Sequence, residues 1–228
     1  MHSNGVVLVI YAGHAETGAT ATLAKLVAEG AATCPNTTVK VVRAEDATNE
    51  DVNRAGAIIL GTGDYNGNPE PALLSFIDNK LKAGRSISRM DGMVSAGFCT
   101  AAGVASGAQP ILESITRATM TFGAVFIGGS TWETSQGVIG IVVDSPDDKW
   151  TWAPGQDHLQ AQARDLGRRV ADVASFFPGS YEKVRKYPHG EKVVEIIPSE
   201  NISVNLYWLC FWISVALVLF IAFPKQMN

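Results

Sequence analysis

The chain has 228 residues, of which 46% are hydrophobic and 18% are charged. This length suffices for one sizeable core with an appendage, and the composition excludes a chain that is disordered throughout. The formal net charge is −4 at pH 7, so no overall basic character points to nucleic acid as a partner.

The cysteines and histidines form no metal or disulfide pattern. Cys34, Cys99 and Cys210 lie far apart and make no CxxC pair. An odd, scattered set argues against a disulfide framework and a zinc site, and it favours a reducing compartment. The four histidines show no metal-ligand spacing. We therefore expect no metal.

Short β-branched runs alternate with helical patterns along residues 5–177. The expected strands are Val6–Tyr11, Thr38–Val42, Ala57–Gly61, Met93–Phe98 and Ala124–Gly128. The expected helices are Ala19–Ala32, Asn49–Arg54, Pro71–Lys82, Gly107–Thr119 and Asp157–Phe177. This alternation predicts a parallel sheet covered on both faces, in a doubly wound three-layer α/β sandwich. Ligands of such sheets bind beyond the carboxyl ends of the strands, so the loops there are candidate sites.

The loop after the first expected strand leads directly into a helix. Gly18 permits close backbone approach, and the hydroxyls of Thr17, Thr20 and Thr22, with helix N-terminal amides such as that of Ala19, can hold a phosphate. Through Thr17, Gly18 and Thr20, the loop resembles the flavodoxin phosphate loop, Ser/Thr-x-Thr-Gly-x-Thr. The resemblance implies that these residues bind the phosphate of FMN.

Two residues of this loop depart from the flavodoxin pattern. Ala15 stands where the family has a hydroxyl, and Glu16 adds a carboxylate. An inward-pointing carboxylate would repel phosphate by roughly 1 to 4 kcal/mol at a separation of about 4 Å, depending on the local dielectric. An ordinary strand-to-helix turn is the alternative interpretation.

The loop after the third strand, residues 61–78, is the most specific stretch. It resembles the WrbA-type quinone reductases in its Gly-Thr…Gly-Asn…Phe-hydrophobic-Asp layout, and the NADPH-dependent FMN reductases in its Tyr-Asn-Gly followed by Pro, a helix and Asp. The resemblance implies that this loop wraps the flavin ring, with the following residues beside it: Asp64, Tyr65, Asn66, Gly67 and Asn68. The alternative is a Gly/Asn turn that caps the next helix.

The loop after the fourth strand is rich in small residues, which let a flat ligand lie close to the backbone. Thr100 and Gly103 are its candidate cofactor-binding residues. It resembles the segment before Gly-Gly-Gln in the WrbA type, with Gly107 and Gln109 as loose matches. We expect Cys99 to pack as a small apolar residue at a strand end rather than to act as a redox thiol.

The region after the fifth expected strand divides into three parts. Residues 130–156 are interpreted as a long Gly/Pro/Asp-rich loop, and the last helix closes the domain at residue 177. Residues 178–201, with three prolines and mixed charge, are expected to be a linker. The predicted organisation is thus a domain at 1–177 followed by this linker.

Residues 202–223 contain no charged residue and include interfacial-type aromatics at one end. About 20 such residues span a bilayer as a helix, so we expect a single-pass C-terminal transmembrane helix with a short tail at 224–228. Excess Lys and Arg before the span favour the cytosolic or matrix side for the domain. Endoplasmic reticulum, mitochondria and the bacterial inner membrane are candidate membranes. A buried helix of a soluble core is the alternative.

Together, the three loops resemble flavodoxin-like proteins over residues 5–177, which implies a five-stranded parallel sheet in the order 2-1-3-4-5. The favoured hypothesis is a membrane-anchored FMN protein, an oxidoreductase that passes electrons from NAD(P)H to a quinone or a partner redox centre. The quinone reductases use a histidine after the fifth strand, and residues 128–133 contain none.

The alternative hypothesis is an accessory subunit of a large membrane complex, such as a respiratory one, that has lost FMN binding and acts structurally. A hydrolase has little support, because no Ser or Cys nucleophile sits in an elbow beside a histidine. A signalling receiver domain is disfavoured, because paired acidic residues are missing after the first strand.

Overall fold

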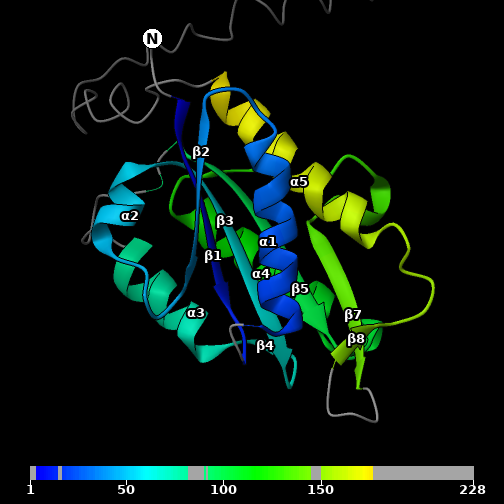
Figure 1. Cartoon of the computed structure of the whole chain (residues 1–228). Coiled ribbons are helices and arrows are strands. Elements are labelled where there is room, and N and C mark those ends of the chain that lie inside the picture. The colour runs from blue at the N-terminus through cyan, green and yellow to red at the C-terminus, as the bar shows by residue number, and fades with distance from the viewer. Residues whose placement is uncertain (1–3, 15–16, 82–89, 91, 145–149, 177–228) are drawn as a thin grey trace, which may run out of the picture. The chain divides into compact units, whose positions relative to one another are not determined.

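The computed structural model describes residues 4–14, 17–81, 90, 92–144 and 150–176 (Figure 1). The predictions for the linker 178–201, the membrane span 202–223 and the tail 224–228 lie outside the described residues, as do Ala15, Glu16 and Cys210. Among the helices of the described ranges, none is long and apolar enough to cross a bilayer.

A mostly parallel sheet forms the central layer. Its strands are β1 (Asn4–Ala12), β2 (Thr37–Arg43), β3 (Ala55–Tyr65), β4 (Asn68–Pro69), β5 (Val94–Ala101), β6 (Val125–Phe126), β7 (Val138–Asp144) and β8 (Trp150–Trp152). The order is β2-β1-β3-β5-β7-β8; β4 pairs with β3 and β6 pairs with β5. Only β4 and β8 are antiparallel to their neighbours within the described part of the chain. With β6 and β7 taken as two parts of one strand, the parallel strands follow the expected order 2-1-3-4-5.

Helices cover both faces of the sheet (Figure 1). They are α1 (Ala19–Ala32), α2 (Asn49–Arg54), α3 (Pro71–Phe76), α4 (Ala108–Thr121) and α5 (Leu159–Ser175). The predicted helix at 71–82 is α-helical only as far as Phe76, and a π-helical turn (Ile77–Leu81) continues it. Pro71 occupies the first turn, where its missing N–H leaves no helical bond unmade.

Two apolar cores lie on opposite faces of the sheet. Successive residues of β1 alternate between them: Val7 and Val9 pack with α1 and α5, whereas Leu8 and Ile10 pack on the other face, with residues of α3 and α4. All four side chains are buried. Because a parallel strand covered on both faces needs apolar residues at every position, the continuous run at the start of the sequence forms a central strand.

Helices α1 and α5 lie side by side on one face (Figure 1), and their backbones come close at two glycines. A Cβ at Gly30 would lie 1.9 Å from the Arg164 carbonyl oxygen, and a Cβ at Gly167 would lie 1.8 Å from the Val27 carbonyl oxygen. No side chain fits at either position. Glycine therefore sets the separation of the two helices.

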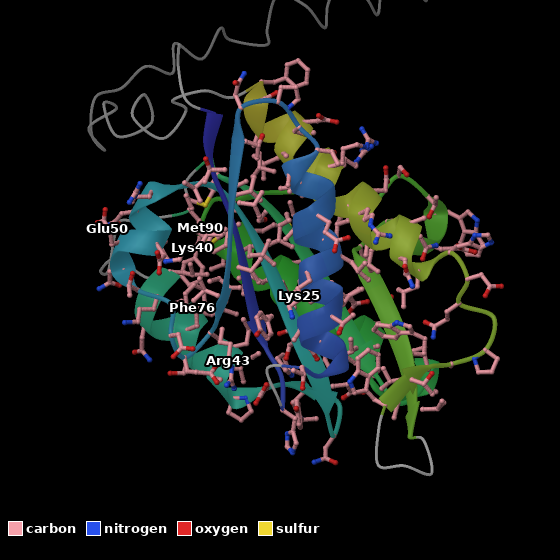
Figure 2. All side chains as sticks on the ribbon, in the orientation of Figure 1. Lys25, Lys40, Arg43, Glu50, Phe76 and Met90 are labelled. Atoms are coloured by element: carbon pink, nitrogen blue, oxygen red, sulfur yellow. The ribbon has the colours of Figure 1, made fainter. Side chains whose placement is uncertain are left out.

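On the other side, α2 is fixed by the side chain of Asp51. Thr48 and Asp51 form a capping box at the helix N-terminus, with the Asp51 N–H donating to the Thr48 hydroxyl at 3.2 Å. Asp51 also forms an ion pair with Lys40. Lys40 belongs to the edge strand β2 and is labelled in Figure 2. Burial alone raises the pKa of Asp51, but the hydrogen bonds from Lys40 and Thr48 outweigh it, and the pKa lies below its ordinary value.

The fifth parallel strand differs from the sequence prediction. Only Val125–Phe126 of the expected strand Ala124–Gly128 is extended, and it pairs with the start of β5. The chain then folds back on itself, with the Gly129 N–H donating to the Thr134 carbonyl at 2.7 Å, before β7 pairs with the end of β5. A Cβ at Gly128 would lie 1.8 Å from the Ser135 carbonyl oxygen, so the excursion requires glycine there.

The interpretation of residues 130–156 as a long loop is wrong. This region holds a 3-10 turn (Trp132–Thr134) and the antiparallel pair β7–β8, which extends the sheet. Beyond this pair, the Gln156 side chain bonds both backbone groups of Ile141, accepting from its N–H at 2.7 Å and donating to its carbonyl at 2.5 Å. The amide side chain thus pairs with the edge of β7 where β8 has ended.

Candidate functional site

The N-terminus of α1 opens at the carboxyl edge of the sheet. Gly18 precedes the helix with extended backbone, and no side chain caps the first turn. The Thr22 N–H makes a helical bond to the Gly18 carbonyl at 3.0 Å, so the amides of Ala19, Thr20 and Ala21 have no acceptor within the helix. The first turn contains no acidic residue. Free amides and the helix dipole make this end suited to an anion.

Thr20 lies at the centre of the three predicted loops. It is only 6% exposed, and its hydroxyl lies 2.6 Å from that of Thr100, at the end of β5. Gly13 leaves room for it, because a Cβ at Gly13 would lie 2.9 Å from the Thr20 Cβ. Gly63 is also a neighbour, since a Cβ there would be in ordinary contact with the Thr20 Oγ1 at 3.6 Å. The ends of β1, β3 and β5 therefore meet around one threonine.

The second loop is a tight hairpin rather than an open loop. Asn66 and Gly67 both have positive φ, of 54° and 79°, and connect β3 to β4, as a two-residue hairpin requires. The Gly67 N–H donates to the Asp64 carboxylate at 2.8 Å, and the Asn68 side chain donates to the Asn66 carbonyl at 3.1 Å. These polar residues order the turn, and both asparagines are exposed.

Tyr65 joins the hairpin to the first loop. Its hydroxyl lies 3.1 Å from Nδ1 of His14, and the two rings stack with centroids 5.7 Å apart. Burial first, and the Glu70 charge second, raise the pKa of Tyr65, so it remains a neutral phenol at physiological pH. Burial, and then the charge of Glu45, also raise the pKa of Glu70 above its ordinary range.

The third loop contacts the hairpin through glycine. Gly107 has a φ of 128°, and a Cβ there would lie 2.6 Å from the Gly67 Cα. The Ser106 hydroxyl closes a turn by donating to the Gly103 carbonyl at 2.6 Å. A Cβ at Gly103 would meet nothing within 4 Å, so this glycine leaves open space.

Trp150 of β8 contacts the loop between β1 and α1. Its indole N–H donates to the Thr17 carbonyl at 3.4 Å, and its ring meets Trp152 edge-to-face with centroids 4.8 Å apart. Trp150 lies in the region 130–156, which the sequence predicts to be a loop, and it is not among the candidate site residues. The alternation Trp150-Thr151-Trp152 is a strand signal that could have placed it beside β7.

The structure brings all twelve predicted site residues to one edge of the sheet. Those that contact another loop or strand end of this edge are Thr17, Thr20, Tyr65, Gly67 and Thr100. Those that lie in the same loops or in the first helical turns are Gly18, Ala19, Thr22, Asp64, Asn66, Asn68 and Gly103. His14, Gly13, Gly63 and Trp150 join them without having been proposed as ligand-binding residues.

Cys99 lies beneath this edge and is fully buried as a free thiol. Burial, with a smaller effect of the Asp64 charge, raises the pKa of its thiol to about 12. The expectation that Cys99 packs as a small apolar residue is confirmed. Cys34 is also free, and no group of three or more metal-ligating side chains occurs in the ranges that the structure covers.

The class of protein is therefore a doubly wound α/β domain, in which ligands bind beyond the carboxyl ends of the strands. No protein-family model matches the chain. The chain is 32% identical over 190 residues to a flavodoxin of Aquifex aeolicus (strain VF5), which covers 81% of this chain and 97% of that protein. The chain belongs to the flavodoxin family.

Solved structures share the fold. A WrbA-like flavodoxin from Agrobacterium tumefaciens has a TM-score of 0.55 at 24% identity and covers 75% of this chain and 98% of its own. A flavodoxin from the domain Archaea has a TM-score of 0.55 at 16% identity, covering 75% and 99%. The two-electron reduced flavodoxin of Megasphaera elsdenii has a TM-score of 0.52 at 19% identity, covering 73% and 98%.

Membership of this family implies FMN as the cofactor, and the described residues fit it. Free amides at the start of α1 and the hydroxyls of Thr17 and Thr20 are suited to the phosphate. Open space at Gly103, and the ring of Tyr65 at the hairpin, are suited to a flat aromatic group. No carboxylate lies in the first helical turn to oppose the phosphate.

Proposed function

We propose that the chain is an FMN-binding redox protein that is anchored to a membrane and passes electrons from NAD(P)H to a quinone or a partner redox centre. The observation that supports FMN binding most directly is the convergence of three strand ends on Thr20, beside the free N-terminus of α1. When bound, FMN supplies the electron-transfer chemistry, and the chain supplies binding and electrostatics.

The residues of the edge have separate tasks in this proposal. Thr17, Thr20, Thr22 and the amides of Gly18 and Ala19 bind the phosphate. The hairpin residues and the small residues from Thr100 to Gly103 flank the ring. His14 fixes the Tyr65 ring by a hydrogen bond and stacking, so that the aromatic face keeps one orientation.

The membrane anchor rests on sequence. Residues 202–223 have the length and apolar character of a bilayer-spanning helix, and the basic residues before them favour the cytosolic or matrix side for the domain. A quinone dissolves in the bilayer, so an anchored flavin domain would meet it there. Alkaline carbonate extraction tests the anchor: the full chain should stay in the membrane pellet, and a chain ending at residue 177 should not.

A structural accessory subunit without FMN is the second candidate. Ala15 and Glu16 favour it, because one removes a hydroxyl from the phosphate loop and the other adds negative charge. The absence of histidine from residues 128–133 also removes the group that the quinone reductases use.

Titration of the full-length protein with FMN in mild detergent separates the two candidates. The redox proposal predicts saturable binding at one FMN per chain. The variant Ala15→Ser with Glu16→Gln is the matched control, because it restores a hydroxyl and removes the charge. Binding by this variant but not by the natural sequence would contradict the redox proposal and support the accessory role.

A further inference from the structure

The hydrogen bond between Thr20 and Thr100 joins two loops that are 80 residues apart in the chain. The oxygens are 2.6 Å apart, and the residues are 6% and 5% exposed. Within the described part of the chain, each hydroxyl has the other as its one hydrogen-bonding partner. Either hydroxyl can be the donor in this bond, and a bond this short fixes the direction of the donated proton.

The surroundings of Thr20 limit its side chain to this arrangement. Gly13 packs against the Thr20 side chain. A Cβ at Gly13 would lie 2.9 Å from the Thr20 Cβ and 3.1 Å from the Thr20 Oγ1. Gly63, which pairs with Thr100 in the sheet, lies on the next strand. The strand ends thus surround the Thr20 side chain, and among them Thr100 can orient the Thr20 hydroxyl through its hydrogen bond.

A hydroxyl has one proton to donate and two lone pairs to accept with. If Thr20 donated to Thr100, its proton would not be available to an anion at the start of α1. If Thr100 donates to Thr20, the Thr20 proton is free for the anion, and the chain of two hydroxyls polarises that donor.

We propose that Thr100 is a positioning residue: it donates to Thr20 and thereby presents the Thr20 proton to the phosphate of the flavin nucleotide. The inference rests on the proposed function and assigns Thr100 a role different from direct contact with the flavin ring. It predicts that Thr100 matters for FMN, which carries a phosphate, and not for riboflavin, which lacks one.

The test compares FMN and riboflavin affinities by equilibrium dialysis on the full-length protein in mild detergent. Thr100→Val keeps the shape of the side chain and removes the donor. It should weaken FMN binding about 3- to 10-fold, the range expected for one hydrogen bond, while riboflavin binding changes less than about twofold. Thr100→Ser keeps the hydroxyl and should restore the natural FMN affinity.

A double-mutant cycle distinguishes positioning from an independent contact. Thr20→Val should itself weaken FMN binding, and adding Thr100→Val should cause no further loss. Should Thr100→Val fail to fold, as judged by circular dichroism, Thr100→Ala replaces it in both comparisons.

Three results would overturn the inference while leaving the proposed function intact: additive losses in the cycle, equal losses for FMN and riboflavin, or unchanged FMN affinity in Thr100→Val. If the natural protein bound neither flavin, the proposed function would fail, and the inference with it.

Discussion

Replacing Gly167 with alanine sets two opposing effects against each other at the contact between α1 and α5. Gly167 lies in the interior of α5, where alanine has the better helix propensity by about 1 kcal/mol. The new Cβ, however, would lie 1.8 Å from the Val27 carbonyl oxygen and 2.9 Å from the Ala31 nitrogen. These are backbone atoms, so no side-chain rotation can make room.

The distances in the structure indicate that the steric clash outweighs the gain in helix propensity. Carbon and oxygen atoms in contact lie roughly 3.5 Å apart, so the helices would have to separate by more than about 1.5 Å. Overpacking of this kind costs about 3 kcal/mol or more when the obstacle is rigid. After the propensity gain, Gly167→Ala should destabilise the fold by about 2 kcal/mol, which lowers Tm by about 4 to 8 °C for a domain of this size.

Urea unfolding followed by circular dichroism measures this difference, with Gly103→Ala as the control, because a Cβ at Gly103 meets nothing within 4 Å. Equal or greater stability of Gly167→Ala would refute the reasoning, since helix propensity would then have outweighed the contact.

Three further substitutions, at Asp51, Glu70 and Gly107, test other contacts of the fold. Asp51→Ala removes the partner of Lys40 and should cost about 1 to 2 kcal/mol in urea unfolding at pH 7. Because the pKa of Asp51 is lowered in the fold, this difference should disappear as the pH falls below about 4; a loss independent of pH would contradict it. Glu70→Gln should raise Tm at pH 7, because burial raises the pKa of Glu70 and its charge therefore opposes folding above the unfolded pKa; the gain should disappear below about pH 4, and a lower Tm at pH 7 would refute this. Gly107→Ala should lose about 2 to 3 kcal/mol in urea unfolding, because its φ is positive and its Cβ meets the backbone of the β3–β4 hairpin, whereas Gly103→Ala should change little; similar losses in both would contradict the contact.

Elements with strong local signals could be predicted from the sequence. The bounds of α1 and α2 match their predictions, because apolar periodicity defines the first and the Thr48–Asp51 capping box begins the second. The parallel sheet followed from continuous apolar runs such as β1. For the same reason, the candidate residues of the three loops lie at one edge, since parallel strands end on the same side.

The sequence predictions were wrong where tertiary contacts determine the local structure. Nothing local showed that the excursion after Gly128 would interrupt the fifth strand, because it depends on backbone contact with Ser135. The run Val138–Asp144 was assigned to a loop on account of the Gly, Pro and Asp residues around it, although its own apolar pattern indicates a strand. The contact of Gly30 with the backbone of α5 likewise has no local signal. The Thr20–Thr100 bond likewise depends on sheet register and could not be derived from either loop alone.

The flavin content of the purified full-length protein tests the central claim most directly. The protein would be extracted in mild detergent, its visible absorbance recorded, and the released flavin identified by chromatography against FMN and riboflavin, before and after incubation with FMN. We expect FMN at one per chain, at the latest after incubation. A protein that is folded by circular dichroism yet carries no flavin and takes up none would contradict it.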